Sequence, residues 1–317
     1  MKKKILITGC AGFIGFHLSK RLLQSYNVIG IDKLTNYYSK KLKLKRLKEL
    51  LKYKNFTFYK LDLSKRKSLV PLKKIKFYAV IHLAAQPGVR NSIYKPLSYI
   101  NDNILSQVNL LQEIKNKNIN KFIYASSSSI YGSTNKRNFS ENDKLMRPLS
   151  LYSATKQSIE QITSYYSNYY KIPSIGLRFF TCYGPWGRPD LSVTKITNDI
   201  LKKKKVILLN KGKTKRDYTY IDDTVDGIIK CLKFNQKNSF HEIFNLGTGR
   251  TVSIFNLTNI IGKILKVNYK VILKTHHPTD MKVTKSNMTK SKKLLGFNPK
   301  VDLKKGIKKY LDWHLNY

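Results

Sequence analysis

The first half of the chain alternates short hydrophobic runs with longer segments in which hydrophobic positions repeat at helical spacing. A short continuous run is typical of a strand buried on both faces, and a longer amphipathic segment is typical of a helix that covers a sheet. Strands that alternate with helices predict a parallel sheet with helices on both faces. The predicted strands are 4–8, 27–31, 56–61, 79–84, 121–126 and 174–178, and the predicted helices are 13–24, 39–51, 97–115 and 152–170.

The pattern changes after about residue 180, where loops become frequent and the predicted elements are short and scattered. We therefore expect a doubly wound α/β domain over residues 1–180 and a smaller α/β domain that mainly comprises residues 181–317. Two later segments, 220–230 and 243–246, are expected to return to the first domain. The predicted fold class is thus a doubly wound parallel sheet with a smaller C-terminal domain.

Three glycines, Gly9, Gly12 and Gly15, follow the first predicted strand and open the first predicted helix. Glycine at such positions permits a tight turn, a close approach of the backbone to a diphosphate, and close packing of helix on strand. The N-terminus of the helix then presents its partial positive charge to the phosphates. Glycines are common in turns, so the triplet gains its meaning from its place between a strand and a helix. It predicts a dinucleotide site that includes Phe13 and Ile14.

Asp32, at the end of the second predicted strand, indicates which dinucleotide is bound. A carboxylate there accepts hydrogen bonds from both ribose hydroxyls of the adenosine half and repels a 2′-phosphate, so NAD is favoured over NADP. Lys33 beside it is a counter-indication, because a basic side chain can accept that phosphate. Asp62 and Leu63 follow the third strand and are expected near the adenine ring, although Asp62 is equally typical of a helix N-cap.

The ends of the fourth and fifth predicted strands carry small residues, which let a backbone pass close to a ligand. Leu83, Ala84 and Ala85 follow the fourth strand and are expected to line the cofactor site. Four serines, 126–129, follow at the end of the fifth strand. Ligands bind at the carboxyl ends of parallel strands, so a serine there can hydrogen-bond a reacting oxygen. His82 is more typical of a structural histidine than of a catalytic one.

Tyr152 and Lys156 stand four residues apart at the start of a predicted helix. This spacing places both side chains on one helix face, about 6 Å apart. The ordinary pKa of tyrosine, about 10, is too high for an efficient base at neutral pH. A lysine ammonium and an oxidised nicotinamide ring both favour the phenolate. The spacing is common by chance in a chain rich in both residues, but its position after the serine-bearing strand indicates redox chemistry on a hydroxyl group.

Together these residues resemble the extended short-chain dehydrogenase/reductase family, which includes nucleotide-sugar epimerases and dehydratases. The resemblance covers essentially the whole chain and implies a Rossmann fold, bound NAD and a nucleotide-sugar substrate. Within the family, segments 30–38 and 178–190 look most like those of UDP-glucuronate 4-epimerases. The matching stretches are ITGCAGFIG (7–15), HLAAQPGVR (82–90), YASSSSIYG (124–132), YSATK (152–156), RFFTCYGPWGRPD (178–190), KRDYTYIDD (215–223) and FNLGTG (244–249).

The resemblance also implies roles for individual residues. Tyr152 would remove the proton of the sugar C4 hydroxyl, and Ser127 would be the catalytic serine. Lys156 would hold the nicotinamide ribose and lower the pKa of the tyrosine. Asn103 would lie near the cofactor, and Arg216 would lie by the nucleotide half of a UDP-sugar.

Ser128 and Ser129 help to choose the reaction, because the relatives diverge after a shared 4-keto intermediate. In the 4,6-dehydratases of the family an Asp-Glu pair follows the catalytic residue, and in the UDP-glucuronate decarboxylases a Glu stands two residues after it. This chain has serines at those positions, so the resemblance implies simple epimerisation at C4. The alternatives are a UDP-glucose/UDP-galactose 4-epimerase and, ranked lower, a 4,6-dehydratase, a decarboxylase or a non-enzymatic NAD-sensing relative.

Arg188 bears on the identity of the sugar. A 4-keto uronic acid is a β-keto acid that tends to lose CO₂, so an epimerase of UDP-glucuronate must hold the C6 carboxylate in an orientation that prevents this. Arg188 is suited to bidentate carboxylate binding, and the resemblance places Arg188 and Thr181 by that carboxylate. A diphosphate contact or a surface position are the alternatives for Arg188, and UDP-galactose 4-epimerase then becomes the better interpretation. The family pattern Pro-Gly-Asp-Val reads Pro-Thr-Asp-Met at 278–281.

The charge of the chain is its most unusual bulk property: 61 basic against 18 acidic residues give a net charge of +43. The lysines are spread along the chain, apart from short runs such as 202–205. No motif typical of an RNA or DNA reader accompanies them, so adventitious polyanion binding is expected and no specific nucleic acid partner is predicted.

The remaining composition agrees with a cytoplasmic enzyme. No apolar run approaches the roughly 20 residues of a membrane span. Cys10, Cys182 and Cys231 lack C-x-x-C spacing, which favours reduced thiols and argues against a disulfide framework or a metal site. The resemblance implies a homodimer whose interface is formed by the helices after Leu97 and at 152–170.

Overall fold

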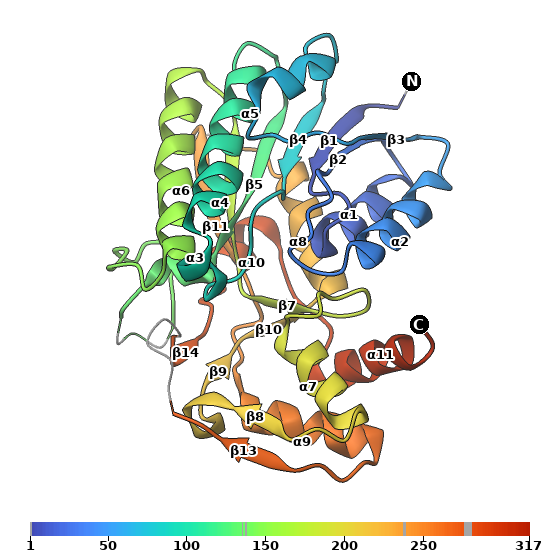
Figure 1. The fold of residues 1–317 in the computed structure, drawn as a ribbon. Helices are drawn as coiled ribbons and strands as arrows, with labels where there is room; N and C mark the ends of the chain where they lie inside the picture. The colour runs from blue at the N-terminus through green and yellow to red at the C-terminus, as the bar shows by residue number, and fades with distance from the viewer. Residues whose placement is uncertain (1, 135, 137, 237–238, 276–280) are drawn as a thin grey trace.

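A seven-stranded parallel sheet forms the centre of the molecule, in the order β11-β6-β5-β4-β1-β2-β3 (Figure 1). The computed structural model describes residues 2–134, 136, 138–236, 239–275 and 281–317. The strand order reverses between β4 and β1, and doubly wound sheets bind ligands outside the carboxyl ends of the strands at such a point. The strands are β1 (Lys4–Thr8), β2 (Asn27–Ile31), β3 (Phe56–Tyr59), β4 (Ala79–His82), β5 (Lys121–Ser127), β6 (Ser174–Phe179) and β11 (His241–Leu246).

Both faces of this sheet are covered by helices, which explains why its strands are continuous hydrophobic runs. Because side chains alternate along a strand, Ile5 and Ile7 of β1 pack into one hydrophobic core while Leu6 packs into another. The predicted fold class is therefore confirmed. One face carries α1 (Phe13–Leu22), α2 (Lys40–Leu51) and α8 (Ile221–Lys233), and the other carries α4 (Pro96–Tyr99), α5 (Ser106–Ile114) and α6 (Leu151–Tyr169).

The predicted strands and helices are present, with ends that differ by one or two residues. Strands predicted to end at Leu61 and Ala84 end earlier, because the last residues of each run already belong to loops that line a cavity. The predicted helix 97–115 differs more, since it contains a π-helical turn, η2 (Ile100–Leu105). Asp102, which lies in this turn, is buried. Hydrophobic spacing alone does not distinguish this turn from a regular helix.

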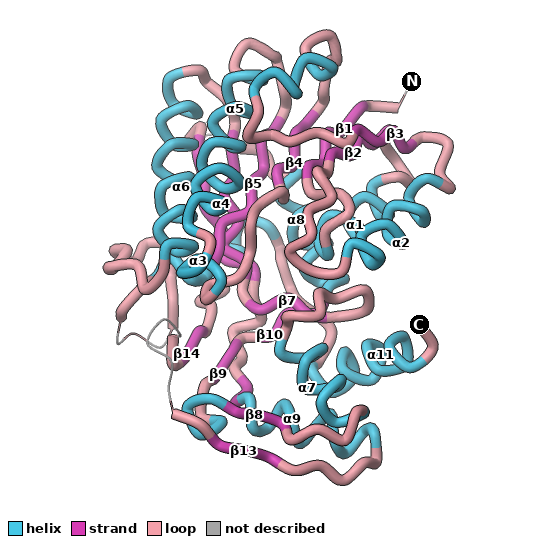
Figure 2. The backbone as a smooth tube through the Cα atoms, in the orientation of Figure 1, coloured by secondary structure: helices cyan, strands magenta, loops and turns pink. Residues whose placement is uncertain are grey.

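The chain after β6 builds a smaller part with short strands, which Figure 2 shows below the large sheet. Strand β11 returns to the large sheet beside β6, and α8 packs against α1. The segment 278–281 departs from the family pattern, and three of its four residues lie outside the described residues. The elements of the smaller part are β7 (Thr181–Tyr183), α7 (Ser192–Leu201), β8 (Val206–Leu208), β9 (Lys215–Arg216), β10 (Tyr218–Tyr220), β12 (Val252–Ser253), α9 (Ile254–Leu265), β13 (Val271–Leu273), β14 (Val283–Thr284), α10 (Thr289–Leu295) and α11 (Leu303–Leu315).

Candidate active site

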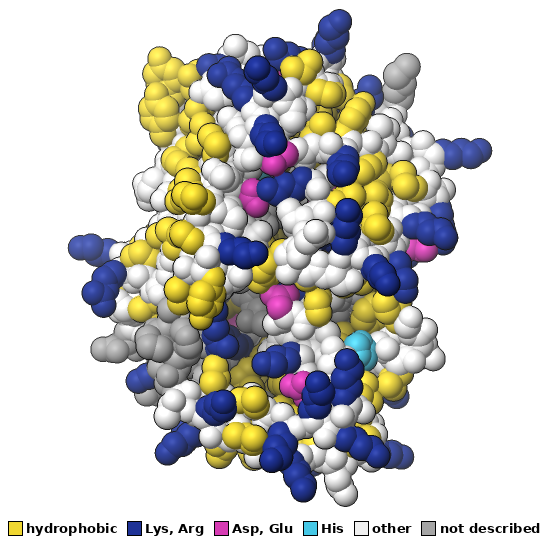
Figure 3. All heavy atoms as spheres, viewed as in Figure 1, with side chains coloured by type: hydrophobic (Ala, Val, Ile, Leu, Met, Phe, Trp, Pro, Cys, Tyr) yellow, Lys and Arg dark blue, Asp and Glu magenta, His cyan; other side chains and the backbone are white. Residues whose placement is uncertain are grey.

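A cavity of about 540 Å³ runs along the carboxyl ends of the central strands. Figure 3 shows the surface hollowed where the large sheet meets the smaller part. The structure brings nearly all of the predicted site residues to the wall of this one cavity. They are Gly9, Gly12, Phe13, Ile14, Gly15, Asp32, Asp62, Leu63, Leu83, Ala84, Ala85, Ser127, Ser128, Ser129, Tyr152, Lys156, Thr181, Arg188 and Arg216.

The glycine turn at one end of the cavity leaves no room for side chains. Gly9 has a φ of 71°, and a Cβ there would lie 2.8 Å from the Ala84 nitrogen. A Cβ on Gly15 would lie 2.1 Å from the Gly9 carbonyl oxygen. The N-terminus of α1 has no side-chain cap, so its backbone N–H groups are available to a diphosphate. This cradle fits the pyrophosphate of a dinucleotide.

Asp32 closes the turn from the neighbouring strand. Its carboxylate accepts hydrogen bonds from the Ala11 nitrogen at 3.2 Å and from the Leu34 nitrogen at 2.8 Å. These bonds fix the carboxylate at the cavity wall, where a ribose would meet it. Asp62 accepts hydrogen bonds from both the backbone and the hydroxyl of Ser64. It therefore closes a local turn and lines the cavity, but it is not a helix N-cap, because the N-cap of the following 3₁₀ helix (Arg66–Leu72) is Lys65.

Asn103 is the one predicted cofactor contact that does not line the cavity. It is buried, with 1% of its surface exposed. Its side-chain oxygen accepts from the Gln86 nitrogen at 2.7 Å, and its amide donates to the Thr155 hydroxyl at 3.0 Å. Asn103 thus ties the loop after β4 to α6, and it supports the cavity wall from behind. His82 is likewise held behind the wall, where its Nδ1 lies 2.7 Å from the Thr8 hydroxyl.

Tyr152, Lys156 and Ser127 all line the cavity. The Lys156 Nζ donates to the Ala125 carbonyl at 2.7 Å and lies 5.9 Å from the centroid of the Tyr152 ring. Burial raises the pKa of Tyr152, and a hydrogen bond with Ser127 and the charge of Arg188 oppose this rise. The lowered tyrosine pKa that the resemblance implies is therefore not produced by the protein alone.

Lys156 itself is affected by its surroundings. Burial lowers its pKa to about 7, and the Glu160 carboxylate opposes this shift. NAD, when bound, supplies the hydride acceptor and the positive charge of its oxidised nicotinamide ring. The lysine and the tyrosine face the same part of the cavity, so the pair is arranged to hold and move a proton at the tyrosine oxygen.

A buried ion pair fixes the helix that carries these residues. Glu160 accepts two hydrogen bonds from Arg178 of β6, at 2.9 and 3.1 Å, and one from the Ser126 hydroxyl. Both charged side chains are nearly inaccessible. Sequence reasoning missed this pair, although two signals were present: an arginine in a hydrophobic strand, and a glutamate one helical turn after Lys156.

Arg188 lines the cavity but already has a partner. Its guanidinium donates to both carboxylate oxygens of Asp190, at 2.9 and 2.7 Å. The side chain is 22% exposed, so its position is not that of a surface arginine. The Tyr37 hydroxyl donates to the same carboxylate at 3.3 Å. Asp190 was not predicted as a site residue. An anion that binds Arg188 would have to share the guanidinium with Asp190 or displace Asp190 from it.

The cavity has no carboxylate at the two positions after Ser127, where Ser128 and Ser129 stand. Among the described residues that line it, the carboxylates are Asp32, Asp62, Asp102 and Asp190, and none is a glutamate. The acid and base of a dehydratase are thus missing from these positions. Across the described part of the chain, we find no cluster of side chains suited to a metal ion and no helix long and apolar enough to cross a membrane.

The fold and the cavity define a dinucleotide-binding enzyme with a tyrosine–lysine pair, and comparison with known proteins agrees. The NAD-dependent epimerase/dehydratase family matches residues 5–247. An uncharacterised protein of Methanocaldococcus jannaschii is 44% identical over 99% of this chain and 96% of its own length. UDP-glucuronate 4-epimerase 3 of Arabidopsis thaliana is 38% identical over 99% of this chain and 76% of its own length.

A solved structure extends the comparison to three dimensions. UDP-glucuronic acid 4-epimerase from Bacillus cereus, crystallised with UDP-glucuronic acid and NAD, superposes with a TM-score of 0.92 and 34% sequence identity. The match covers 99% of this chain and all of that one. The chain therefore belongs to the NAD-dependent epimerase/dehydratase family and is homologous to UDP-sugar 4-epimerases. Its cofactor is NAD.

Proposed function

We propose that this enzyme interconverts UDP-glucuronate and UDP-galacturonate by epimerisation at C4. The observation that carries the proposal is a single cavity that combines Tyr152, Lys156 and Ser127 with Arg188, without a carboxylate after Ser127. The first three residues serve oxidation of a hydroxyl to a ketone. The arginine serves an anionic substrate.

Each of these residues has a separate role in the proposed reaction. Tyr152 takes the proton from the C4 hydroxyl, and the Ser127 hydroxyl hydrogen-bonds the same oxygen. Lys156 holds the ribose next to the nicotinamide and stabilises the tyrosine phenolate. The C4 hydride would pass to bound NAD and return to the opposite face of C4 after the keto sugar has rotated in the cavity. Tyr152 then returns the proton to the C4 oxygen, and the configuration at C4 is inverted. Arg188 and Thr181 hold the C6 carboxylate so that its bond to C5 does not align with the carbonyl π system.

The test is product analysis with UDP-glucuronate and pure enzyme. We expect UDP-galacturonate to form without added NAD, because the cofactor is restored in each turnover. UDP-xylose as the main product would instead identify a decarboxylase, and unchanged substrate would contradict the proposal.

A second candidate is a UDP-glucose/UDP-galactose 4-epimerase. The observation in its favour is the Arg188–Asp190 pair, which already uses one bidentate edge of the guanidinium, formed by Nε and Nη2. If that pair persists with substrate bound, this edge of Arg188 is closed to a sugar carboxylate. Preference for UDP-glucose over UDP-glucuronate in the same assay would support this candidate.

We also propose that the enzyme is a homodimer. Large hydrophobic side chains are exposed on neighbouring elements of one side, where Figure 3 shows them gathered over α6 and over α3 (Asn91–Tyr94) and α4. Tyr165 and Tyr169 of α6 are 59% and 66% exposed, and Tyr94 of α3 and Leu97 of α4 are 78% and 75% exposed. Helix α6 packs against both α3 and α4, so these side chains form one face suited to a second copy.

Charge placed on this face should separate the dimer. We expect the double variant Leu97→Glu, Tyr169→Glu to have the mass of one chain, 36.8 kDa, in light scattering, while the native protein has twice that mass. Leu273→Glu is the matched control, because Leu273 is 53% exposed on β13 in the smaller part. A native protein of single-chain mass would contradict the proposal, and so would a double variant that stays dimeric.

We propose a reducing compartment, the cytoplasm, as the place of action. The three cysteines, Cys10, Cys182 and Cys231, are all free and buried. Burial raises the pKa of each thiol, which keeps the thiols protonated and unreactive.

A further inference from the structure

The adenosine end of the cavity, marked by Asp32, carries two lysines that the proposed reaction does not use. Lys33 follows Asp32 directly, and Lys43 comes from α2; both line the cavity. A basic side chain beside this ribose is what a protein uses to bind the 2′-phosphate of NADP. The chain thus places a residue that favours NADP next to one that favours NAD. The side-chain contacts of Lys33 resolve this conflict.

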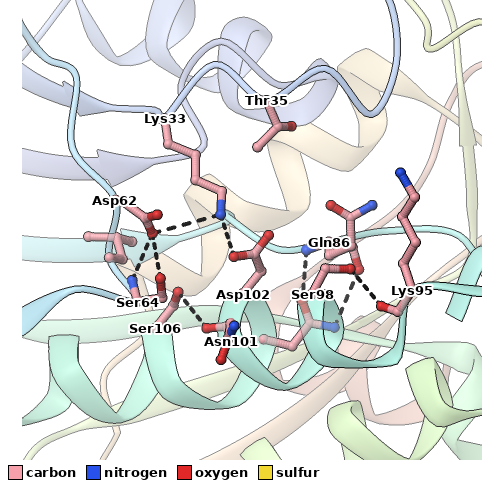
Figure 4. A network of polar contacts seen from close by, with 12 residues as sticks. Lys33, Thr35, Asp62, Ser64, Gln86, Lys95, Ser98, Asn101, Asp102 and Ser106 are labelled. Carbon is pink, nitrogen blue, oxygen red and sulfur yellow. Dashed lines mark hydrogen bonds and ion pairs between the residues drawn. The ribbon is translucent and has the colours of Figure 1, made fainter.

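Lys33 points across the cavity and is held between two carboxylates (Figure 4). Its Nζ lies 2.5 Å from Oδ1 of Asp102 and 3.7 Å from Oδ1 of Asp62. Asp32 does not share in this contact, because its carboxylate accepts from backbone nitrogens instead. One lysine and two carboxylates leave this group with a net negative charge, which disfavours a phosphate nearby.

Both carboxylates belong to short side chains, whose positions are set by the backbone segments that carry them. Asp102 lies in the π-helical turn η2, and only 11% of its side chain is exposed. Asp62 is held by hydrogen bonds from the backbone and hydroxyl of Ser64, at 3.0 and 2.7 Å. The long lysine side chain is therefore the adaptable member, and the carboxylates determine where it points.

Lys43 is not a substitute for Lys33. Its Nζ donates to the Thr35 hydroxyl at 2.8 Å, and the residue is 6% exposed. Burial lowers its pKa, and the nearby Asp32 carboxylate opposes that shift. Movement of Lys43 to a phosphate would break a partly buried hydrogen bond. Lys33, in contrast, would only exchange a carboxylate partner for the phosphate.

We propose that Asp102 determines cofactor specificity: by pairing with Lys33 it withholds that lysine from the ribose and keeps the site selective for NAD over NADP. Asp32 repels the 2′-phosphate, and Asp102 removes the cation that would attract it. The proposal rests on the NAD site but is independent of which sugar is the substrate.

The test is equilibrium binding of NAD and of NADP to the Asp102→Asn variant, after removal of resident cofactor. Asparagine keeps the shape of the side chain and removes its charge, so Lys33 retains only the more distant Asp62. We expect NADP to bind about tenfold more tightly than to the native protein, the size of one new charge-assisted contact. The affinity for NAD should change by less than about threefold, because this ion pair is partly exposed.

Two controls separate the role of Lys33 from a general effect of charge. The double variant Lys33→Met, Asp102→Asn should lose the gain in NADP affinity, because the freed cation is gone. Asp143→Asn breaks a Lys–Asp pair of similar length, Lys136–Asp143 at 2.6 Å, away from the cavity, and should leave the affinity ratio unchanged. A purely structural role of Asp102 would weaken both dinucleotides equally.

If cofactor removal unfolds a variant, the preference can be measured in another way. The nucleotides that copurify with the variant are extracted, and mass spectrometry gives the ratio of bound NADP to bound NAD. An unchanged ratio in Asp102→Asn would overturn the proposal. A gain in NADP that persists in the double variant would overturn it as well. Neither readout contains a sugar, so a failure here is distinguishable from a failure of the proposed epimerase activity.

Discussion

Replacement of Tyr152 by phenylalanine is expected to lower the turnover number by about 100-fold to 10,000-fold, the usual contribution of a positioned acid–base group. The substitution removes one oxygen and keeps the ring, which packs edge-on against Tyr99 with a centroid distance of 6.2 Å. Without that oxygen no group at this position can take the C4 proton. The Ser127 hydroxyl remains, but its ordinary acidity is far too low for it to replace the phenol.

This variant should keep its cofactor and its substrate. We expect NAD to be held mainly at the glycine turn and at Asp32, so the nucleotide that copurifies with the variant should match that of the native protein. Tyr170→Phe, at the far end of the same helix, is the matched control and should keep full activity. Turnover within tenfold of the native value in the Tyr152 variant would show that another group acts as the base.

The second large effect is expected at Arg188. Replacement by leucine should lower kcat/KM for UDP-glucuronate by about 30-fold or more. Bound substrate would bury the contact between Arg188 and the carboxylate, and truncation of one partner of a buried charged contact commonly costs at least about 2 kcal/mol. The leucine variant should also release CO₂, because in the proposed reaction Arg188 holds the 4-keto uronic acid in an orientation that protects it. Rates and CO₂ can be followed in one assay, with UDP-pentose measured by chromatography.

The pairing of Arg188 with Asp190 requires a separate control. Asp190→Asn breaks the same ion pair but keeps the arginine, so it should lose much less activity than the leucine variant. If both variants lose activity equally, the ion pair and not the arginine is what matters. If the leucine variant keeps its preference for UDP-glucuronate, Arg188 does not bind the carboxylate and the neutral hexose substrates become the better assignment.

Much of the architecture could be predicted because it depends on local patterns. Alternation of buried strands and amphipathic helices specified the parallel sheet, and the glycines of the first turn are required by space that no Cβ can occupy. The tyrosine and lysine of α6 could be placed on one face from their spacing alone. The strand ends then brought these motifs to one edge of the sheet, as a parallel topology requires.

The contacts that were missed join residues far apart in the sequence. The pairs Glu160–Arg178, Lys33–Asp102 and Arg188–Asp190 depend on which side chains the fold brings face to face. The first two have no spacing rule, and the third was overlooked because an acid two residues after an arginine is commonplace. The π-helical turn that contains Asp102 was also not predicted, because it shifts the hydrophobic repeat by only one residue at one point of a long amphipathic segment.

In the proposed reaction the hydrogen bonded to C4 leaves that carbon and returns to it within one cavity. The most direct test follows UDP-glucuronate labelled with deuterium at C4 by NMR and mass spectrometry, using pure enzyme without added NAD. We predict UDP-galacturonate that retains the deuterium at C4. Formation of UDP-galacturonate without the label, or of products that lack the carboxylate, would contradict the claim.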